Sequence, residues 1–103
     1  MKITYDDSIK KALSKLESSS VTKVMRTIDL LERFGKDLRM PHSKKISESL
    51  FELRVKGKQE IRVFYTFRKN YGVLLHLFIK KSQKTPLKEL AVAKSRLYLL
   101  DYI

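Results

Sequence analysis

Residues 51–80 read FELRVKGKQEIRVFYTFRKNYGVLLHLFIK, and the apolar residues of this stretch recur at every second position. A period of two is typical of half-buried β-strands, whose side chains alternate between the two faces of a sheet. The alternation predicts strands over residues 51–56, 61–68 and 73–80. The side chains expected to face the core are Phe51, Leu53, Val55, Ile61, Val63, Tyr65, Phe67, Val73, Leu75, Leu77 and Ile79.

Short links join these predicted strands. Residues 57–60 and 69–72 contain glycine or asparagine, which favour tight turns. Turns of this length connect antiparallel neighbours, whereas parallel strands need a long crossover. The sequence therefore predicts an antiparallel sheet, with residues 1–5 as a further short edge strand.

Before this stretch, the apolar period changes to that of helices. Apolar residues at i, i+3, i+4 and i+7 predict a helix over residues 7–16 and a second over residues 21–34. Ser19 or Ser20 is the expected N-cap of the second helix, and Gly35 is its expected end. Because few residues separate the two helices, we expect an antiparallel helical hairpin.

The remaining segments complete the outline of the chain. Residues 36–47 show no period and are predicted to form a basic loop. A last helix is predicted over residues 85–100, with Thr85 as its N-cap and Pro86 as its first residue. The whole pattern predicts an α+β fold, in which an N-terminal helical hairpin packs on a small antiparallel sheet of three or four strands with a C-terminal helix.

Length and composition limit what the chain can be. With 103 residues, 43% of them hydrophobic, it is long enough to bury one core and too short for two, so we expect a single domain over residues 1–103. The N-terminal residues carry acids where a signal peptide needs an apolar run, and no stretch reaches the ~18 apolar residues of a membrane span. We therefore expect a cytoplasmic protein that has no membrane partner.

Positive charge is concentrated in the centre of the chain. The chain has 23 Lys and Arg against 11 Asp and Glu, a formal net charge of +12. Residues 36–84 hold a net charge of +9, whereas residues 1–35 hold +2 and residues 85–103 hold +1. Charge of this size indicates an anionic partner, which is a nucleic acid, an anionic membrane or an acidic protein.

Strand alternation places several of these bases on one face of the predicted sheet, opposite the core. They are Arg54, Lys56, Arg62, Arg68, His76 and Lys80, with Phe64 and Phe78 among them. Bases interleaved with aromatic rings are typical of surfaces that bind a phosphate chain and stack nucleobases. The alternative is a solvated sheet face whose Lys and Arg side chains guard its edges.

The chemistry available to this face is narrow. The chain has no cysteine, and its two histidines, His42 and His76, lack metal-ligand spacing, so no metal or cofactor is expected. Arginines can still promote cleavage of RNA by its own 2′-hydroxyl, because they stabilise the charge that develops on the phosphate, while clustered cations favour a lysine base. In so apolar a strand, His76 is at least as readily a hydrogen-bonded structural residue as a catalytic one.

Three segments together resemble a known family. They are residues 51–55 (FELRV), 61–65 (IRVFY) and 74–86 (LLHLFIKKSQKTP). They are similar to the HigB-type, phage-derived branch of the RelE/ParE toxin superfamily, and the run from Lys80 to Pro86 is the most specific part. The resemblance implies a RelE-like microbial RNase toxin fold and the toxin of a type II toxin–antitoxin pair.

The resemblance also implies an activity and its partners. Such a toxin is a metal-independent, ribosome-dependent endoribonuclease that cleaves messenger RNA in the ribosomal A site and blocks translation. Its cognate antitoxin is often a helix-turn-helix protein.

The motif carries over to particular residues. Arg54 and Arg62 match phosphate-clamping catalytic positions on adjacent strands, Lys80 and Lys81 match the basic end of the last strand, and His76 is a further candidate proton carrier. RelE itself has a lysine pair on the first of these strands, where this chain has Glu52 in place of one. The residues expected to bind RNA are Lys44, Lys45, Lys56, Lys58, Arg68 and Lys84.

Two other functions stay open at this point. ParE relatives share the fold but inhibit gyrase, and they lack the basic catalytic set, so Arg54 and Arg62 favour RNA as the target. A basic nucleic-acid-binding module without chemistry would carry the same charged face.

Overall fold

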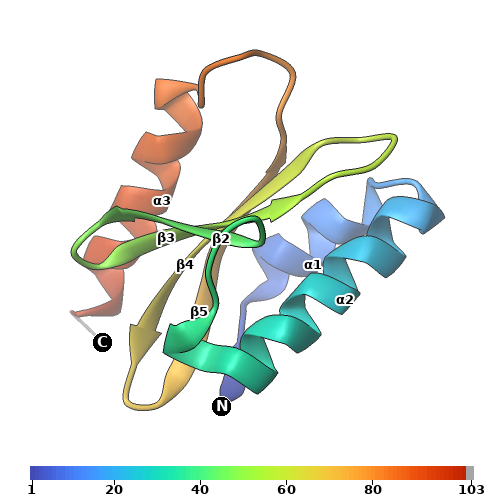
Figure 1. Cartoon of the computed structure of the whole chain (residues 1–103). Helices are drawn as coiled ribbons and strands as arrows, with labels where there is room; N and C mark the ends of the chain where they lie inside the picture. The colour runs from blue at the N-terminus through green and yellow to red at the C-terminus, as the bar shows by residue number, and fades with distance from the viewer. Residues whose placement is uncertain (102–103) are drawn as a thin grey trace.

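The alternating stretch forms the centre of the sheet in a computed structural model of the chain, which describes residues 1–101. Helices cover the sheet from both sides (Figure 1). In chain order, the elements are β1 (Lys2–Thr4), α1 (Asp7–Ser14), α2 (Ser18–Phe34), the 3-10 helix η1 (Gly35–Asp37), β2 (Ser43–Ser47), β3 (Leu50–Val55), β4 (Ile61–Arg68), β5 (Tyr71–Ile79) and α3 (Leu87–Leu100).

The sheet is larger than predicted and is mixed. Within residues 1–101 it has five strands in the order β1-β5-β4-β3-β2, and β1 runs parallel to β5 while the other pairs are antiparallel. The α+β class is confirmed, but the antiparallel sheet of three or four strands is wrong. The extra strand, β2, lies in the segment predicted as a loop. The sequence did not indicate this strand, because an edge strand that exposes Lys44 and Lys45 shows little apolar alternation.

The hairpin turn between β4 and β5 is short, and the glycine that follows it allows close packing of two strands. Lys69 and Asn70 have φ values of 49° and 69°, which suit the two-residue hairpin turn that joins β4 to β5. Because Tyr71 already pairs with Arg68, Gly72 lies within β5 and not in the link predicted over residues 69–72. A Cβ atom at Gly72 would lie 2.7 Å from Ile3 Cδ1, so the glycine lets β1 approach β5 closely.

Helices α1 and α2 cover one face of the sheet (Figure 1). Ile9 of α1 and Val24, Ile28 and Leu31 of α2 pack against inward-facing strand residues such as Leu53 and Val63. Tyr65 belongs to this core and is 1% exposed, as its parity in the sequence predicted.

The ends of the helices differ partly from expectation. Gly35, with a φ of 53°, ends α2 as predicted. The helix begins at Ser18, with Glu17 as its N-cap, so the assignment of Ser19 or Ser20 to the cap is wrong. The backbone N–H of Glu17 instead donates to Gln59 Oε1 at 3.1 Å, which ties this end of α2 to the hairpin between β3 and β4.

Helix α3 covers the opposite face of the sheet. Ala93 on the helix packs with Leu50, Phe64, Leu75 and Phe78, which form a second core. Leu75 joins this core because an irregularity in the pairing of β4 with β5, between Phe64 and Tyr65, shifts the alternation of β5. The prediction that Val73 and Leu75 face the same side as Leu77 is therefore wrong.

Helix α3 also begins later than predicted. Its N-cap is Pro86 and its first residue is Leu87, because the Thr85 hydroxyl donates to Glu52 Oε2 at 3.4 Å rather than capping the helix. No helix within residues 1–101 is long and apolar enough to cross a membrane.

Candidate functional site

Two arginines meet across β3 and β4. Arg54 and Arg62 are direct cross-strand partners, so both side chains lie on the face that α3 covers in part. The Arg54 side chain is 23% exposed, whereas that of Arg62 is only 5% exposed. The structure thus brings the two predicted clamp residues together, although Arg62 is buried rather than pointing off an open face.

A buried carboxylate lies between the two arginines. Glu52 Oε1 is 3.2 Å from Arg54 Nε and 3.7 Å from Arg62 Nε, and the residue is 1% exposed. Sequence reasoning noted Glu52 only as a departure from RelE. The signal was present, because residues i and i+2 of a strand share a face, which puts Glu52 beside Arg54.

Arg62 retains unused hydrogen-bonding capacity. Its Nε is the one buried side-chain nitrogen or oxygen without a hydrogen-bond partner in the part of the chain that the structure describes. Its terminal nitrogens have long contacts, with Nη2 3.6 Å from Glu60 Oε1 and Nη1 donating to the Ile61 carbonyl at 3.5 Å. A guanidinium with so few short hydrogen bonds is suited to binding an additional anion.

The lysines after β5 have different environments. Lys80 Nζ donates to the carbonyls of Ser82 and Gln83 at 2.6 and 2.8 Å, so this ammonium shapes the loop before α3. Lys81 and Lys84 are exposed. Lys81 lines a shallow pocket of about 370 Å³ together with Glu60, and Glu60 in turn contacts Arg62. Glu60 therefore borders both the pocket that holds Lys81 and the buried Arg62.

His76 lies between β5 and α3. Its Nε2 is 2.9 Å from Glu89 Oε1, and Arg96 Nη1 is 3.4 Å from its Nδ1. Because Arg96 can only donate, Nδ1 accepts and Nε2 carries the proton that it donates to Glu89. Both ring nitrogens thus contact α3, an arrangement that favours the structural role over the catalytic one.

The predicted stacking platform for nucleobases is wrong. Phe64 is 0% exposed and Phe78 is 6% exposed, and their rings stack on each other with centroids 5.6 Å apart. Both belong to the core beneath α3. The sequence pattern placed them correctly on the arginine face but did not reveal that a helix covers them.

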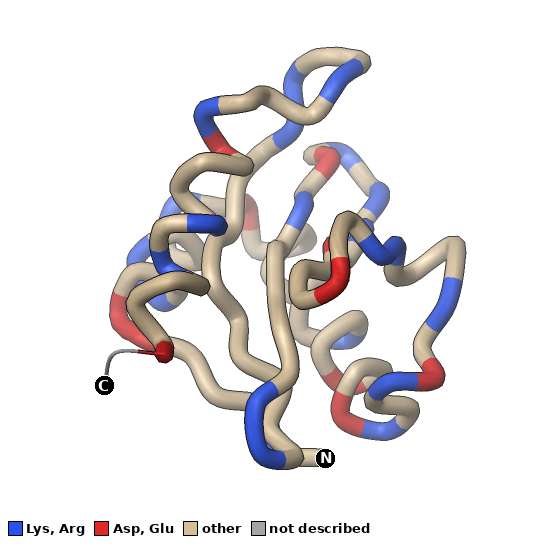
Figure 2. The backbone as a smooth tube through the Cα atoms, turned by 90° about the vertical axis from the view of Figure 1, so that its left-hand side faces the viewer, with Lys and Arg blue, Asp and Glu red and all other residues tan. Residues whose placement is uncertain are grey.

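The residues expected to bind RNA lie along the edges and turns. Lys44 and Lys45 are exposed on β2, and Lys56 and Lys58 are exposed at the hairpin between β3 and β4. Arg68 is held by Asp101, with its Nε 3.1 Å from Oδ1. Figure 2 shows basic residues spread over much of the backbone, including the loop at the top that precedes α3.

A basic pocket extends from Arg54 towards α2. The pocket measures about 390 Å³ and contains no acidic residue in its lining. Its basic side chains are Lys23, Arg26, His42, Arg54 and Lys56. Sequence reasoning missed Lys23 and Arg26 because it treated α2 only as a packing helix, yet Lys23 Nζ reaches the Lys56 carbonyl at 3.4 Å.

Metal ligands do not cluster in the described structure. Within residues 1–101, no group of three or more His, Cys, Asp or Glu residues could hold a metal ion. The charged groups that meet on the arginine face are instead Arg54 and Arg62 with Glu52 between them.

A mixed sheet flanked by helices, with paired arginines on one face and a net charge of +12, defines a small basic α+β protein. Residues 11–98 match the family of phage-derived Gp49-like proteins (DUF891), and the chain belongs to this family. The family is toxin-like and related to RelE/ParE. No curated protein shows significant sequence similarity to the chain.

Proposed function

We propose that the chain is the toxin of a type II toxin–antitoxin pair, of the HigB type, and that it cleaves messenger RNA on the ribosome in the cytoplasm. The observation that carries this proposal is the in-register pair Arg54 and Arg62, with a guanidinium nitrogen on Arg62 that makes no hydrogen bond. A phosphate that bridges two arginines is bound in a geometry suited to stabilising extra negative charge. Membership in a toxin-like family supports the same function.

The proposed reaction uses the RNA as its own nucleophile. The 2′-oxygen loses its proton to a base and attacks the adjacent phosphorus, and the bond from phosphorus to the 5′-oxygen breaks as that oxygen gains a proton. The products are a 2′,3′-cyclic phosphate and a 5′-hydroxyl. Arg54 and Arg62 stabilise the charge on the phosphorane, and Glu52 fixes the orientation of both guanidinium groups through their Nε atoms.

The remaining basic residues bind the RNA backbone in this proposal. Lys81 and Lys84 lie in the loop before α3, while Lys44 lies on the neighbouring strand β2 and Lys56 directly follows β3. These exposed cations supply affinity that weakens with salt rather than chemistry. The cognate antitoxin, of the helix-turn-helix type, neutralises the toxin.

The decisive experiment maps RNA ends. On induction of the wild-type chain in growing cells, new messenger RNA 5′ ends should cluster within codons. Arg54→Ala should lower the cleavage rate by about 100-fold or more, as expected when one charge-stabilising donor is lost. Lys10→Ala, at an exposed position on α1, is the matched control and should cleave normally.

The other functions give different outcomes. Growth arrest with intact messenger RNA and broken DNA would favour gyrase inhibition and overturn the proposal. A folded Arg54→Ala variant that cleaves at the wild-type rate would remove the arginine pair as the site. Because Arg62 is buried, Arg62→Ala is interpretable only when circular dichroism shows a folded protein.

A further inference from the structure

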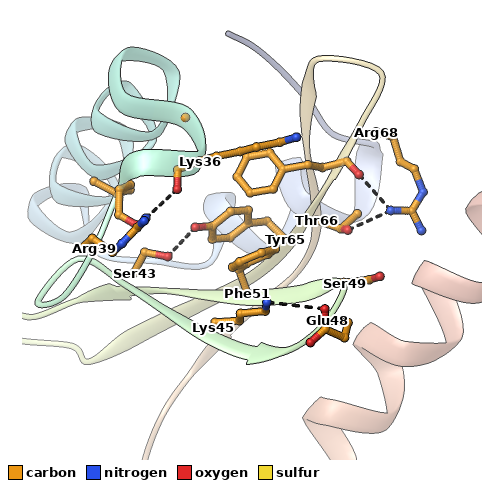
Figure 3. Close-up of a pocket in the computed structure, with 13 residues that line it drawn as sticks. Lys36, Arg39, Ser43, Lys45, Glu48, Ser49, Phe51, Tyr65, Thr66 and Arg68 are labelled. Atoms are coloured by element: carbon orange, nitrogen blue, oxygen red, sulfur yellow. Dashed lines mark hydrogen bonds and ion pairs between the residues drawn. The ribbon is translucent and has the colours of Figure 1, made fainter.

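A third pocket lies on the other side of the sheet, at the end away from Lys80. It measures about 580 Å³, within the range of roughly 300–1,000 Å³ that small-molecule sites occupy. Phe51, Tyr65 and Phe67 line it, and these rings belong to the core formed with α1 and α2. Figure 3 shows Phe51 and Tyr65 surrounded by polar side chains such as Arg39, Ser43 and Lys45.

The rings form one connected aromatic surface. The centroids of Phe51 and Tyr65 are 5.4 Å apart in a stacked arrangement, and Phe67 meets Phe51 edge-on at 5.1 Å. Phe51 and Phe67 are half-buried, so each presents part of its ring to the pocket. Such a surface suits a flat aromatic ligand, because every nucleobase has a π-face.

The polar part of the pocket is built into the fold. The Tyr65 hydroxyl forms a short hydrogen bond with the Ser43 hydroxyl, and both residues are buried (Figure 3). Burial raises the pKa of the Tyr65 phenol above its ordinary value of 10.0, although the Ser43 hydrogen bond and the Arg39 charge act in the opposite direction. The phenol therefore stays neutral at physiological pH and does not repel an anion.

Two cations on the rim have no acidic partner within residues 1–101. Lys36 Nζ lies 5.8 Å from the centroid of the Phe67 ring. Arg39 uses Nη1 to donate to the carbonyls of Lys36 and Leu38, and its Nε and Nη2 atoms have no partner among the described residues. The other cations of the lining, Lys45 and Arg68, pair with Glu48 and Asp101. Lys36 and Arg39 thus leave the rim positive beside the aromatic surface.

We propose that this pocket binds one nucleoside monophosphate unit of single-stranded RNA, with its base against Phe51 and Phe67 and its phosphate at Lys36 and Arg39. An apolar ligand would leave the two cations unused, and a cationic ligand would be repelled. The edge strand β2 links this pocket to the arginine face. Lys44 pairs with Glu52 and Lys45 with Phe51, so neighbouring lysines point to opposite faces.

The pocket is separate from the arginine pair. Tyr65 follows Arg62 by three residues on β4, roughly 10 Å along the strand, and the two side chains lie on opposite faces. The inference goes beyond the proposed cleavage and does not depend on it, because nucleotide binding is measured without ribosomes.

Calorimetric titration of the full chain tests the proposal. AMP should bind at one site, and ribose 5-phosphate and adenosine should each bind more weakly because each lacks one half of the contacts. Lys36→Gln should weaken AMP binding about tenfold. Lys10→Gln, which removes the same charge outside the pocket, should leave AMP binding unchanged.

A second variant isolates the base contact. Phe51→Leu should weaken AMP binding and leave ribose 5-phosphate binding unchanged. A 2′-O-methyl tetra-adenylate, which cannot be cleaved through its 2′-oxygen, should displace AMP and lose affinity in Lys36→Gln.

Several outcomes would overturn the inference. Equal binding of AMP and ribose 5-phosphate would make this a phosphate site without base recognition. AMP binding that the oligonucleotide does not displace would indicate a site for free nucleotides rather than RNA. Binding of an oligo-glutamate peptide in the absence of any nucleotide binding would indicate an acidic protein partner.

Discussion

Both faces of the sheet bury apolar side chains, but only one of them also buries charged residues. Towards α1 and α2, the strands bury Leu53, Val63 and Tyr65 in an apolar core. Towards α3, they bury Glu52 and Arg62, the two charged residues that are buried within residues 1–101. Removing charges from water costs several kcal/mol per ion and is a weak source of stability. The comparison teaches that the apolar residues of both faces maintain the fold, whereas the second face also keeps charges that the fold does not need.

The largest expected effect comes from moving a carboxylate to the apolar face. Leu53→Glu places a charge next to the position of Glu52 on the strand but in the core towards α1 and α2, where Leu53 is 0% exposed and its buried neighbours are apolar. We expect a loss of more than about 4 kcal/mol in the free energy of unfolding, because the new charge is buried and unpaired. Urea unfolding followed by circular dichroism measures it. Lys10→Glu, exposed on α1, should have little effect.

If Leu53→Glu unfolded at the wild-type urea concentration, the two faces would be equally tolerant of charge and the comparison would fail.

The second prediction removes the charge that compensates the arginines. Glu52→Gln should lower the free energy of unfolding by about 3 kcal/mol, because it leaves the buried Arg62 with the partly exposed Glu60 as its remaining anionic neighbour. Adding Arg62→Met should recover most of this loss while abolishing toxicity. Glu48→Gln is the control, since Glu48 is exposed at the tip of the hairpin between β2 and β3.

A double variant no more stable than Glu52→Gln alone would show that the buried charges support the fold after all.

The first prediction shows how far the sequence leads and where it stops. Alternation over residues 51–80 identified the central strands, and the same parity put Leu53 in the core and Arg54 beside Arg62. The irregular pairing near Tyr65 was invisible, because β5 is apolar at both parities there and either register fits. The apolar stripe of α3 was visible, but no local pattern states which sheet face a helix will cover.

The candidate site was predicted only in part, because the sequence reveals regular strand pairing but not tertiary contacts. Arg54 and Arg62 follow from strand pairing, which is regular. The pocket near Phe51 depends on Lys36 and Arg39, which follow the end of α2 and have no periodic pattern to place them. Residues in such segments are positioned by tertiary contacts, such as the hydrogen bond from Arg39 to the Lys36 carbonyl, and not by local sequence.

The third prediction concerns the polar pair within the apolar face. Tyr65→Phe should lower the free energy of unfolding by about 1–3 kcal/mol, because the buried Ser43 hydroxyl loses its partner. The folded pKa of Tyr65 is raised, so its contribution to stability is complete below pH 10.0 and is lost as pH rises through the folded pKa. Thermal melts from pH 8 to pH 11 should therefore show a smaller alkaline loss in Tyr65→Phe than in the wild type.

Equal alkaline loss in both proteins would mean that Tyr65 ionises as readily in the folded chain as in the unfolded one.

The N-cap of α1 lies outside both faces, and its removal should change the free energy of unfolding least. The Asp6 carboxylate accepts from the Ser8 backbone N–H at 3.0 Å and caps α1, and Asp6→Ala should cost about 1 kcal/mol. Hydrogen bonding to Ser8 lowers the pKa of Asp6 below its ordinary value of 3.8. Its contribution is therefore present above pH 3.8 and is lost as pH falls through the folded pKa. Acid unfolding of Asp6→Ala, compared with that of Asp7→Ala, separates the effect of the N-cap from that of a neighbouring carboxylate that does not cap the helix.

The parallel pairing of β1 with β5 sets the order in which the molecule can assemble. Lys2–Thr4 pair with Tyr71, Gly72 and Val73, so the first strand made is completed only by the last. At roughly 5–20 residues per second, translation takes several seconds to supply that partner. Until then α1 and α2 have no finished sheet to cover. If the chain is the proposed toxin, a copy interrupted before β5 lacks a finished sheet and is inert.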